Sequence, residues 1–119
     1  MLEKVLHIVM LYDFYGPLLT DKQSLSLEMH YLNDFSLAEI ASELGVSRQA
    51  VHDILKRAEQ IMVDYEEKLR FVERYQRDQQ TLKHIYNLID GLPKQVGNIP
   101  EVGLAIKEIK HLLDYSKEV

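Results

Sequence analysis

Between residues 47 and 57 we identify six candidate side chains for contacts with bases or phosphates. They are Ser47, Arg48, Gln49, His52, Lys56 and Arg57. Guanidinium and amide groups can bind the base edges of a DNA major groove, and lysine or arginine can pair with phosphates. If this segment is a helix that packs through Val51 and Ile54, these polar side chains point away from the protein. The segment is therefore a candidate nucleic-acid-reading helix.

The sequence just before this segment supplies the elements that would hold it. Ser36 and Glu39 form a capping box that starts a short helix, and Gly45 is suited to end that helix. Ser47 can then cap a second helix. Two helices joined by a tight glycine turn form a helix-turn-helix, which we predict at residues 36–58. The alternative is a plain two-helix corner with no role in reading nucleic acid.

The predicted motif also contains apolar residues at the positions that dock its two helices. These positions are Ile40, Leu44, Val46, Val51 and Ile54. Ala41 is small, which allows the two backbones to approach closely. We therefore expect residues 47–56 to form an exposed, outward-facing rod.

The charge of the chain opposes DNA binding. The net charge is −5 at pH 7, and residues 1–47 hold two lysines against seven acids. Residues 48–83 hold eight basic residues against seven acidic ones. Asp53 lies on the candidate reading face, where it could bind a cytosine amino group or pair with Arg57. One such helix is weakly basic, so useful affinity would require a dimer that places two helices in successive grooves.

Two further helices are predicted ahead of the motif. The first spans residues 2–15 and ends before Gly16 and Pro17. The second starts at a capping box of Thr20 and Gln23. The apolar positions expected to pack are Leu2, Val5, Leu6, Val9, Met10 and Phe14 in the first helix, and Leu25, Met29 and Leu32 in the second. With the motif they would form a helix-turn-helix domain over residues 1–63.

No glycine or proline occurs from Arg48 to Asp90. The pattern therefore predicts that the motif's second helix either continues as one long helix or bends between Asp64 and Glu67. Two rows of mostly apolar residues repeat every seventh position, a pattern typical of a coiled coil or helical hairpin. The rows are Val51, Ala58, Tyr65, Val72, Gln79 and Tyr86, and Ile54, Ile61, Lys68, Tyr75, Leu82 and Ile89. This seam predicts a homodimer.

After a turn-rich connector, a last helix is predicted from Pro100 to Ser116, antiparallel to the preceding one. Its apolar stripe is Ile99, Val102, Ile106, Ile109 and Leu113. Residues 64–119 would then be a helical hairpin extension for dimerisation or partner binding. Tyrosines 65, 75, 86 and 115 are expected to pack in these helices. The predicted fold class is all-α: a small helical bundle containing a helix-turn-helix, followed by a long helix and an antiparallel C-terminal helix.

No catalytic constellation is visible in the sequence. The five histidines are widely spaced, no glycine-rich phosphate loop is present, and the chain has no cysteine. We therefore expect a protein that is not an enzyme and needs no metal or cofactor. The longest early apolar run, Val5 to Tyr12, is too short to span a membrane, and no signal peptide is visible.

Two resemblances extend this interpretation. Ser24 to Ala58, with SLSLEMHYLNDFS, EIASELGVS and AVHDILKRAE, resembles the carboxy-terminal helix-turn-helix of bacterial sigma factors. The opening LEKVLHIVMLYDFYGPLLTDKQ, followed by LEMHYLNDFSLAEIA, resembles the YlxM-like family of small bacterial helix-turn-helix proteins over essentially the whole chain. This second resemblance implies a cytoplasmic protein encoded beside the signal-recognition-particle GTPase genes and suspected of a part in that targeting pathway.

Two functions follow as hypotheses. The first is a DNA-binding regulator of transcription that uses the helix-turn-helix. The second is a protein- or RNA-interaction module of the signal recognition particle machinery, with a helix-turn-helix fold that does not read DNA.

Overall fold

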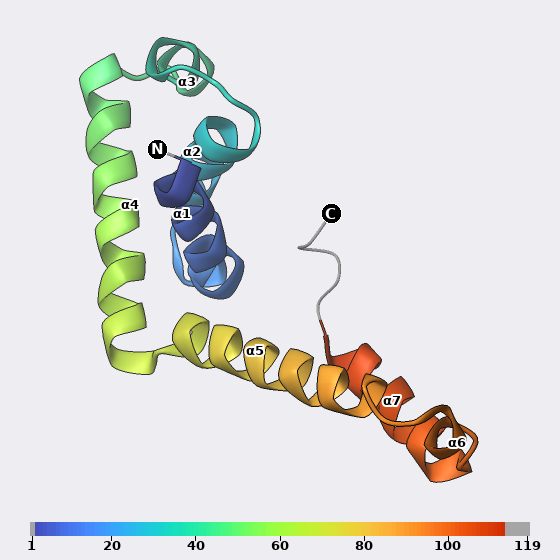
Figure 1. Ribbon diagram of the computed structural model, residues 1–119. Helices are drawn as coiled ribbons and strands as arrows, with labels where there is room; N and C mark the ends of the chain where they lie inside the picture. Colours follow the sequence, from blue (N-terminus) through green and yellow to red (C-terminus); the bar gives the residue numbers. More distant parts are fainter. Residues whose placement is uncertain (1, 114–119) are drawn as a thin grey trace. The chain divides into compact units, whose positions relative to one another are not determined.

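A computed structural model describes residues 2–113, and these residues contain helices and no strand (Figure 1). This confirms the all-α prediction. The elements are α1 (Leu2–Tyr15), the 3₁₀ turn η1 (Gly16–Leu18), α2 (Asp21–Leu27), the π-helix η2 (Glu28–Leu32), α3 (Leu37–Leu44), α4 (Arg48–Leu69), α5 (Phe71–Asp90), α6 (Lys94–Gly97) and α7 (Pro100–Leu112). Among the described residues, those up to Val72 form one compact unit, and those from Glu73 onward form a second.

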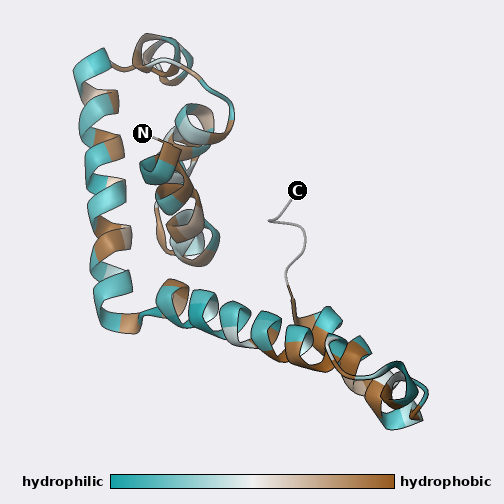
Figure 2. Cartoon of the chain, in the orientation of Figure 1, coloured by the Kyte–Doolittle hydropathy of each residue, from teal (hydrophilic) through white to brown (hydrophobic). Residues whose placement is uncertain are grey.

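The first unit has its core where α4 packs on α1, α2 and α3 (Figure 1). Hydrophobic positions recur at intervals along α4 (Figure 2). The buried apolar residues are Ile8, Leu11, Tyr15, Leu27, Ile40, Ala41, Val51, Leu55, Ala58, Met62 and Val72. The predicted row through Val51 and Ala58 is confirmed, but Leu55 and Met62 take the core positions expected for Ile54 and Ile61. This part of the seam is buried within the chain, so it is not available to a second copy.

The buried face of α1 differs from the predicted one. Ile8, Leu11 and Tyr15 are buried, whereas Leu2 is 71% exposed and Leu6 is 59% exposed. The other expected positions, Val5, Val9, Met10 and Phe14, are partly buried. Apolar residues surround this helix on most sides, so periodicity alone did not identify the face that packs.

The second helix has its predicted capping box but also a different buried face. The Gln23 backbone amide donates to Thr20 Oγ1 at 3.2 Å, and the Thr20 amide donates to Gln23 Oε1 at 3.0 Å. Leu25 and Leu32 are exposed, while Ser26 is fully buried. A serine can occupy this position because its hydroxyl donates to the Lys22 carbonyl oxygen at 2.8 Å.

The helix that follows the turn is interrupted at Arg70, rather than bent between Asp64 and Glu67. Arg70 has φ 55° and ψ 34°, which is the left-handed region. Glu66 Oε1 accepts hydrogen bonds from the Tyr15 hydroxyl at 2.5 Å and from the Val72 amide at 3.0 Å. The Tyr15 ring also stacks on Phe71, with centroids 6.1 Å apart. Contacts with α1 therefore hold a helix break that no glycine or proline marks.

The second unit is the predicted antiparallel hairpin of α5 and α7. Gln79 Nε2, in the middle of α5, donates to the Leu112 carbonyl oxygen at the end of α7, at 3.0 Å. Lys110 Nζ lies 5.7 Å from the centroid of the Tyr86 ring. Half-buried positions recur along both helices: Tyr75, Gln79, Leu82, Tyr86 and Ile89 on α5, and Val102, Ile106, Ile109 and Leu113 on α7. Ile99 is exposed where α7 begins. Predictions for Tyr115 and Ser116 lie outside the described residues.

None of the helices within residues 2–113 is both long enough and apolar enough to cross a lipid bilayer.

Candidate nucleic-acid interface

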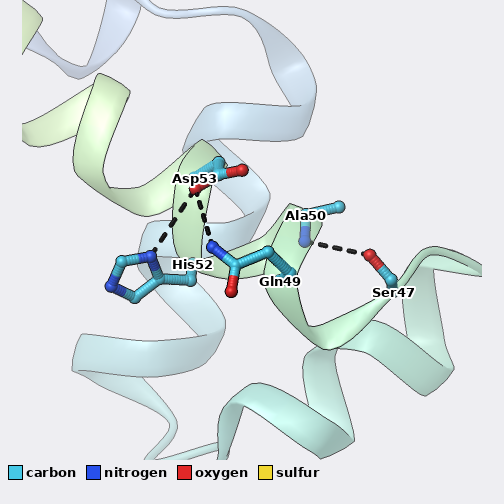
Figure 3. A network of polar contacts seen from close by, with 5 residues as sticks. All are labelled: Ser47, Gln49, Ala50, His52 and Asp53. Atoms are coloured by element: carbon cyan, nitrogen blue, oxygen red, sulfur yellow. Dashed lines mark hydrogen bonds and ion pairs between the residues drawn. The ribbon is translucent and has the colours of Figure 1, made fainter.

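The turn between α3 and α4 is built as the sequence predicts. Ser36 and Glu39 exchange both capping-box hydrogen bonds, at 3.0 and 3.1 Å. Gly45 has φ 66°, and its left-handed conformation ends α3. The Ala50 amide donates to Ser47 Oγ at 3.0 Å, which caps the start of α4 (Figure 3). Local hydrogen bonds therefore fix both helix ends that face the turn.

The two helices dock through a small apolar contact. Ile40 and Val51 are fully buried and Ala41 is nearly so, as predicted. Leu44 and Val46 are partly buried and pack against the same core. Ile54 is only partly buried, because Leu55 occupies the adjacent core position. The resulting helix-turn-helix holds the first turns of α4 at the surface.

All six predicted reading residues lie on α4 or at its N-cap, and all six are exposed. These residues are Ser47, Arg48, Gln49, His52, Lys56 and Arg57, which we call the reading ridge. Among residues 2–113, neither Arg48, Lys56 nor Arg57 has an ion-pair partner. Cations without an internal carboxylate partner are available to an external anion such as phosphate.

Asp53 lies within the ridge, where it is engaged by its neighbours and not by Arg57. Gln49 Nε2 donates to Asp53 Oδ1 at 3.1 Å, and His52 Nδ1 lies 3.6 Å from the same oxygen. Figure 3 shows both side chains directed at this carboxylate. The alternative pairing with Arg57 is thus not formed, and Arg57 keeps its charge available.

An open groove beside the ridge adds a residue that sequence reasoning missed. Lys22 and Gln23 at the start of α2 line this groove together with Lys56 and Arg57 of α4. Lys22 is exposed and has no ion-pair partner among residues 2–113. Lys22 lies ahead of the motif in the sequence, near the start of α2. Only the packing of α2 on α4 brings it beside the ridge. A second, smaller hollow lies on the other side, lined by Leu37, Arg48, Gln49 and His52.

Polar contacts of Glu59 connect α4 to η2 and α1. The Tyr31 hydroxyl donates to Glu59 Oε2 at 3.0 Å, and Lys4 Nζ lies 3.8 Å from Glu59 Oε1. Burial and the Glu59 carboxylate raise the pKa of Tyr31 to about 12, so this hydroxyl remains a neutral donor at ordinary pH. The Glu59 carboxylate therefore has both Tyr31 and Lys4 as partners within the first unit, and it does not project toward a phosphate backbone.

The arrangement of the first unit agrees with comparisons to known proteins. Residues 2–99 match the profile of the UPF0122 family, described as "Putative helix-turn-helix protein, YlxM / p13 like". The chain belongs to the UPF0122 family. This confirms the YlxM-like resemblance, and the matched residues include the whole reading ridge.

Several UPF0122 proteins are similar to this chain over most of their length. One from Desulforamulus reducens is 47% identical over 94 residues, which cover 79% of each chain. One from Geobacillus kaustophilus is 40% identical over 112 residues, covering 94% of this chain and 99% of the relative. One from Caldanaerobacter subterraneus subsp. tengcongensis is 51% identical over 84 residues, covering 71% of this chain and 72% of the relative.

Proposed function

We propose that this UPF0122 protein is a DNA-binding regulator of transcription that places the start of α4 in the major groove. The observation that carries the proposal is the exposed reading ridge, whose cations Arg48, Lys56 and Arg57 have no ion-pair partner within residues 2–113. The capped turn before α4 supports it, because a rigid helix start can be inserted into a groove without a further ordering cost.

The residues of the ridge divide into two roles in this proposal. Arg48, Gln49 and His52 lie nearest the N-terminus of α4 and would meet base edges, as the first turns of a recognition helix do. Lys56 and Arg57, one or two turns later, would pair with phosphates. Lys22 lines the same groove and would add a phosphate contact from α2.

The proposal requires two copies of the chain. Residues 1–72 contain seven Lys and Arg against twelve Asp and Glu, a net charge of −5. Such a unit is repelled by DNA on average, so one ridge gives weak binding. Two ridges about 34 Å apart would enter successive major grooves and add their contacts. A homodimer acting on chromosomal DNA in the cytoplasm is therefore part of the proposal.

A second candidate is a protein- or RNA-interaction module of the signal recognition particle machinery, without catalysis. The acidic charge of the first unit and the carboxylate of Asp53 within the ridge favour its protein-binding form, because both oppose contact with a phosphate backbone, whether of DNA or of RNA. A protein partner with a basic surface would be attracted by the same charge.

The deciding experiment is a binding assay with fragmented genomic DNA over a range of salt concentrations. Arg48→Ala combined with Lys56→Ala should weaken binding roughly tenfold or more and make its salt dependence shallower by about two counterions. Lys94→Ala combined with Lys107→Ala is the matched control, since it removes the same charge from exposed positions of the second unit.

Equal binding by the ridge variant and the control would contradict the reading role of this surface. Absence of DNA binding, together with association of the protein with signal-recognition-particle RNA or GTPase at micromolar concentration, would favour the second candidate instead.

A further inference from the structure

Asp53 places an exposed carboxylate on the reading ridge. Its side chain is 70% exposed, and it lies one helical turn after Gln49 on the same face of α4. A carboxylate at this position weakens contact with phosphate. Its hydrogen-bond partner is Gln49, because Gln49 Nε2 lies 3.1 Å from Asp53 Oδ1. His52 Nδ1 lies 3.6 Å from the same oxygen, which is too far for a hydrogen bond.

The Asp53 carboxylate determines which way the Gln49 amide faces. An ionised carboxylate only accepts hydrogen bonds, so the amide must direct its NH₂ group toward it. Figure 3 shows Gln49 Nε2 directed at Asp53 and the carbonyl oxygen Oε1 turned away from it. Within residues 2–113, Oε1 and the second N–H of Gln49 have no hydrogen-bond partner. Gln49 therefore presents one acceptor and one donor to a ligand.

One acceptor beside one donor matches the major-groove edge of adenine. Adenine presents its N6 amino donor next to its N7 acceptor, and a glutamine amide can bind both. Guanine presents two acceptors, O6 and N7, at the same edge. A free glutamine could rotate its amide and offer the NH₂ group to guanine, but this rotation would turn Gln49 Oε1 onto the Asp53 carboxylate. Asp53 therefore opposes the orientation of Gln49 that binds guanine.

Gln49 lies where a base contact is possible. It is the second residue of α4, just after the N-cap at Ser47, and its side chain is exposed. We propose that Asp53 is a positioning residue, which orients the Gln49 amide so that it selects adenine over guanine. The carboxylate thus lowers affinity for phosphate and raises selectivity for one base. The inference deepens the proposed function and rests on it, since the first turns of α4 must meet base edges.

The same helix contains a second glutamine–aspartate pair, which provides a matched control. Gln60 Nε2 donates to Asp64 Oδ1 at 2.9 Å, and both residues are exposed. Gln60 follows Gln49 by 11 residues, so this pair lies about 16 Å further along the helix axis, beyond the first turns. Asp64→Ala therefore removes the same charge and the same kind of hydrogen bond as Asp53→Ala, but away from the bases.

Nuclear magnetic resonance of the ¹⁵N-labelled full chain tests the hydrogen bond without DNA. Asp53→Ala should shift the side-chain amide signals of Gln49 and leave those of Gln60 in place. Asp64→Ala should have the reverse effect, because each carboxylate accepts from its own glutamine. Gln49 signals that do not respond to Asp53→Ala would overturn the proposal.

Selection from a random-sequence duplex library measures the base preference. The wild-type protein should enrich adenine at one position of each half-site, and Gln49→Ala should lose the preference at that position alone. Guanine in place of this adenine should weaken wild-type binding roughly tenfold or more. Asp53→Ala should reduce that ratio to less than about threefold, because the Gln49 amide can then rotate. Asp64→Ala should keep the wild-type ratio.

Affinity for the unselected library separates positioning from damage to the fold. Asp53→Ala should bind the library at least as tightly as the wild type, because it lacks a charge that opposes phosphate. In the Gln49→Ala protein, Asp53→Ala should cause no further loss of preference, since it acts through Gln49. Weaker library binding by Asp53→Ala, or a further loss of preference in the double variant, would contradict the positioning role.

The base at the selected position decides the rest. Guanine at the position read by Gln49 would overturn the proposal, and so would an Asp53→Ala protein with the wild-type preference for adenine. Those results contradict this inference alone, because the protein still reads DNA. Failure to enrich any duplex contradicts the proposed function itself, so the two failures are distinguishable.

Discussion

The hydrogen bond between Tyr15 and Glu66 offers a direct test of how the long helix is broken. The Tyr15 side chain is 1% exposed, and its hydroxyl donates to Glu66 Oε1 at 2.5 Å and accepts from the Phe71 amide at 3.3 Å. Tyr15→Phe removes these bonds but keeps the ring, which stacks on Tyr65 with centroids 6.0 Å apart. The substitution therefore isolates the contribution of the hydroxyl.

We expect Tyr15→Phe to lower the free energy of unfolding by about 2 kcal/mol. A hydrogen bond to a charged group contributes about 1.5–3 kcal/mol. The bond from the Val72 amide to Glu66 Oε1 should limit the loss, because the carboxylate keeps this donor. Urea denaturation followed by circular dichroism measures the change.

Tyr86→Phe is the control for this experiment. The Tyr86 hydroxyl forms no hydrogen bond within residues 2–113, so its removal should change stability by less than about 0.5 kcal/mol. A double-mutant cycle of Tyr15→Phe with Glu66→Gln should show coupling of about 1 kcal/mol. A loss for Tyr15→Phe no larger than that for Tyr86→Phe would refute the role assigned to this bond at the break.

Three shorter predictions concern the turn and the scaffold behind it. Gly45→Ala should lower the free energy of unfolding by about 1 kcal/mol in urea titration, because Gly45 has φ +66°, which alanine adopts only with strain. Crowding does not contribute, since a Cβ added at Gly45 meets no atom within 4 Å. Gly97→Ala is the control and should cost less, because Gly97 is equally open and has no positive φ. Ser47→Ala should lower the free energy of unfolding by about 1 kcal/mol, because α4 loses its N-cap. An unchanged midpoint of urea denaturation would contradict that capping role. The pKa of Tyr31 is raised from 10.0 to about 12, so its bond to Glu59 should stabilise the fold fully below pH 10 and lose this effect as the pH rises to 12. Tyr31→Phe should therefore make the free energy of unfolding less dependent on pH between 10 and 12.

The turn and the reading ridge could be predicted because their determinants are local. The bonds of Ser36, Gly45 and Ser47 join residues three to five positions apart, so each is visible as a short pattern in the sequence. The ridge follows directly, because the core positions on the start of α4 determine which side chains point outward. The antiparallel hairpin was also predicted, since its two apolar stripes are regular and a turn-rich connector joins them.

Other features depended on contacts between distant residues. The break at Arg70 is held by Tyr15, which is 51 residues from Glu66, and no residue at the break marks it in the sequence. The choice between Ile54 and Leu55 as a core residue could not be made from hydrophobicity, because both are large and apolar. Packing against α1, α2 and α3 determined that Leu55 is buried.

The same division applies to the candidate site. The sequence by itself determined the helix-turn-helix and the six side chains of the ridge, because helix periodicity and capping act over a few residues. The tertiary structure alone placed Lys22 beside Lys56, and its side-chain geometry directed Asp53 to Gln49 and His52, not to Arg57. The position of Lys22 depends on which helices pack together, and no short stretch of sequence encodes that. Asp53 has polar neighbours at both i−4 and i+4, so the sequence alone could not choose between Gln49 and Arg57.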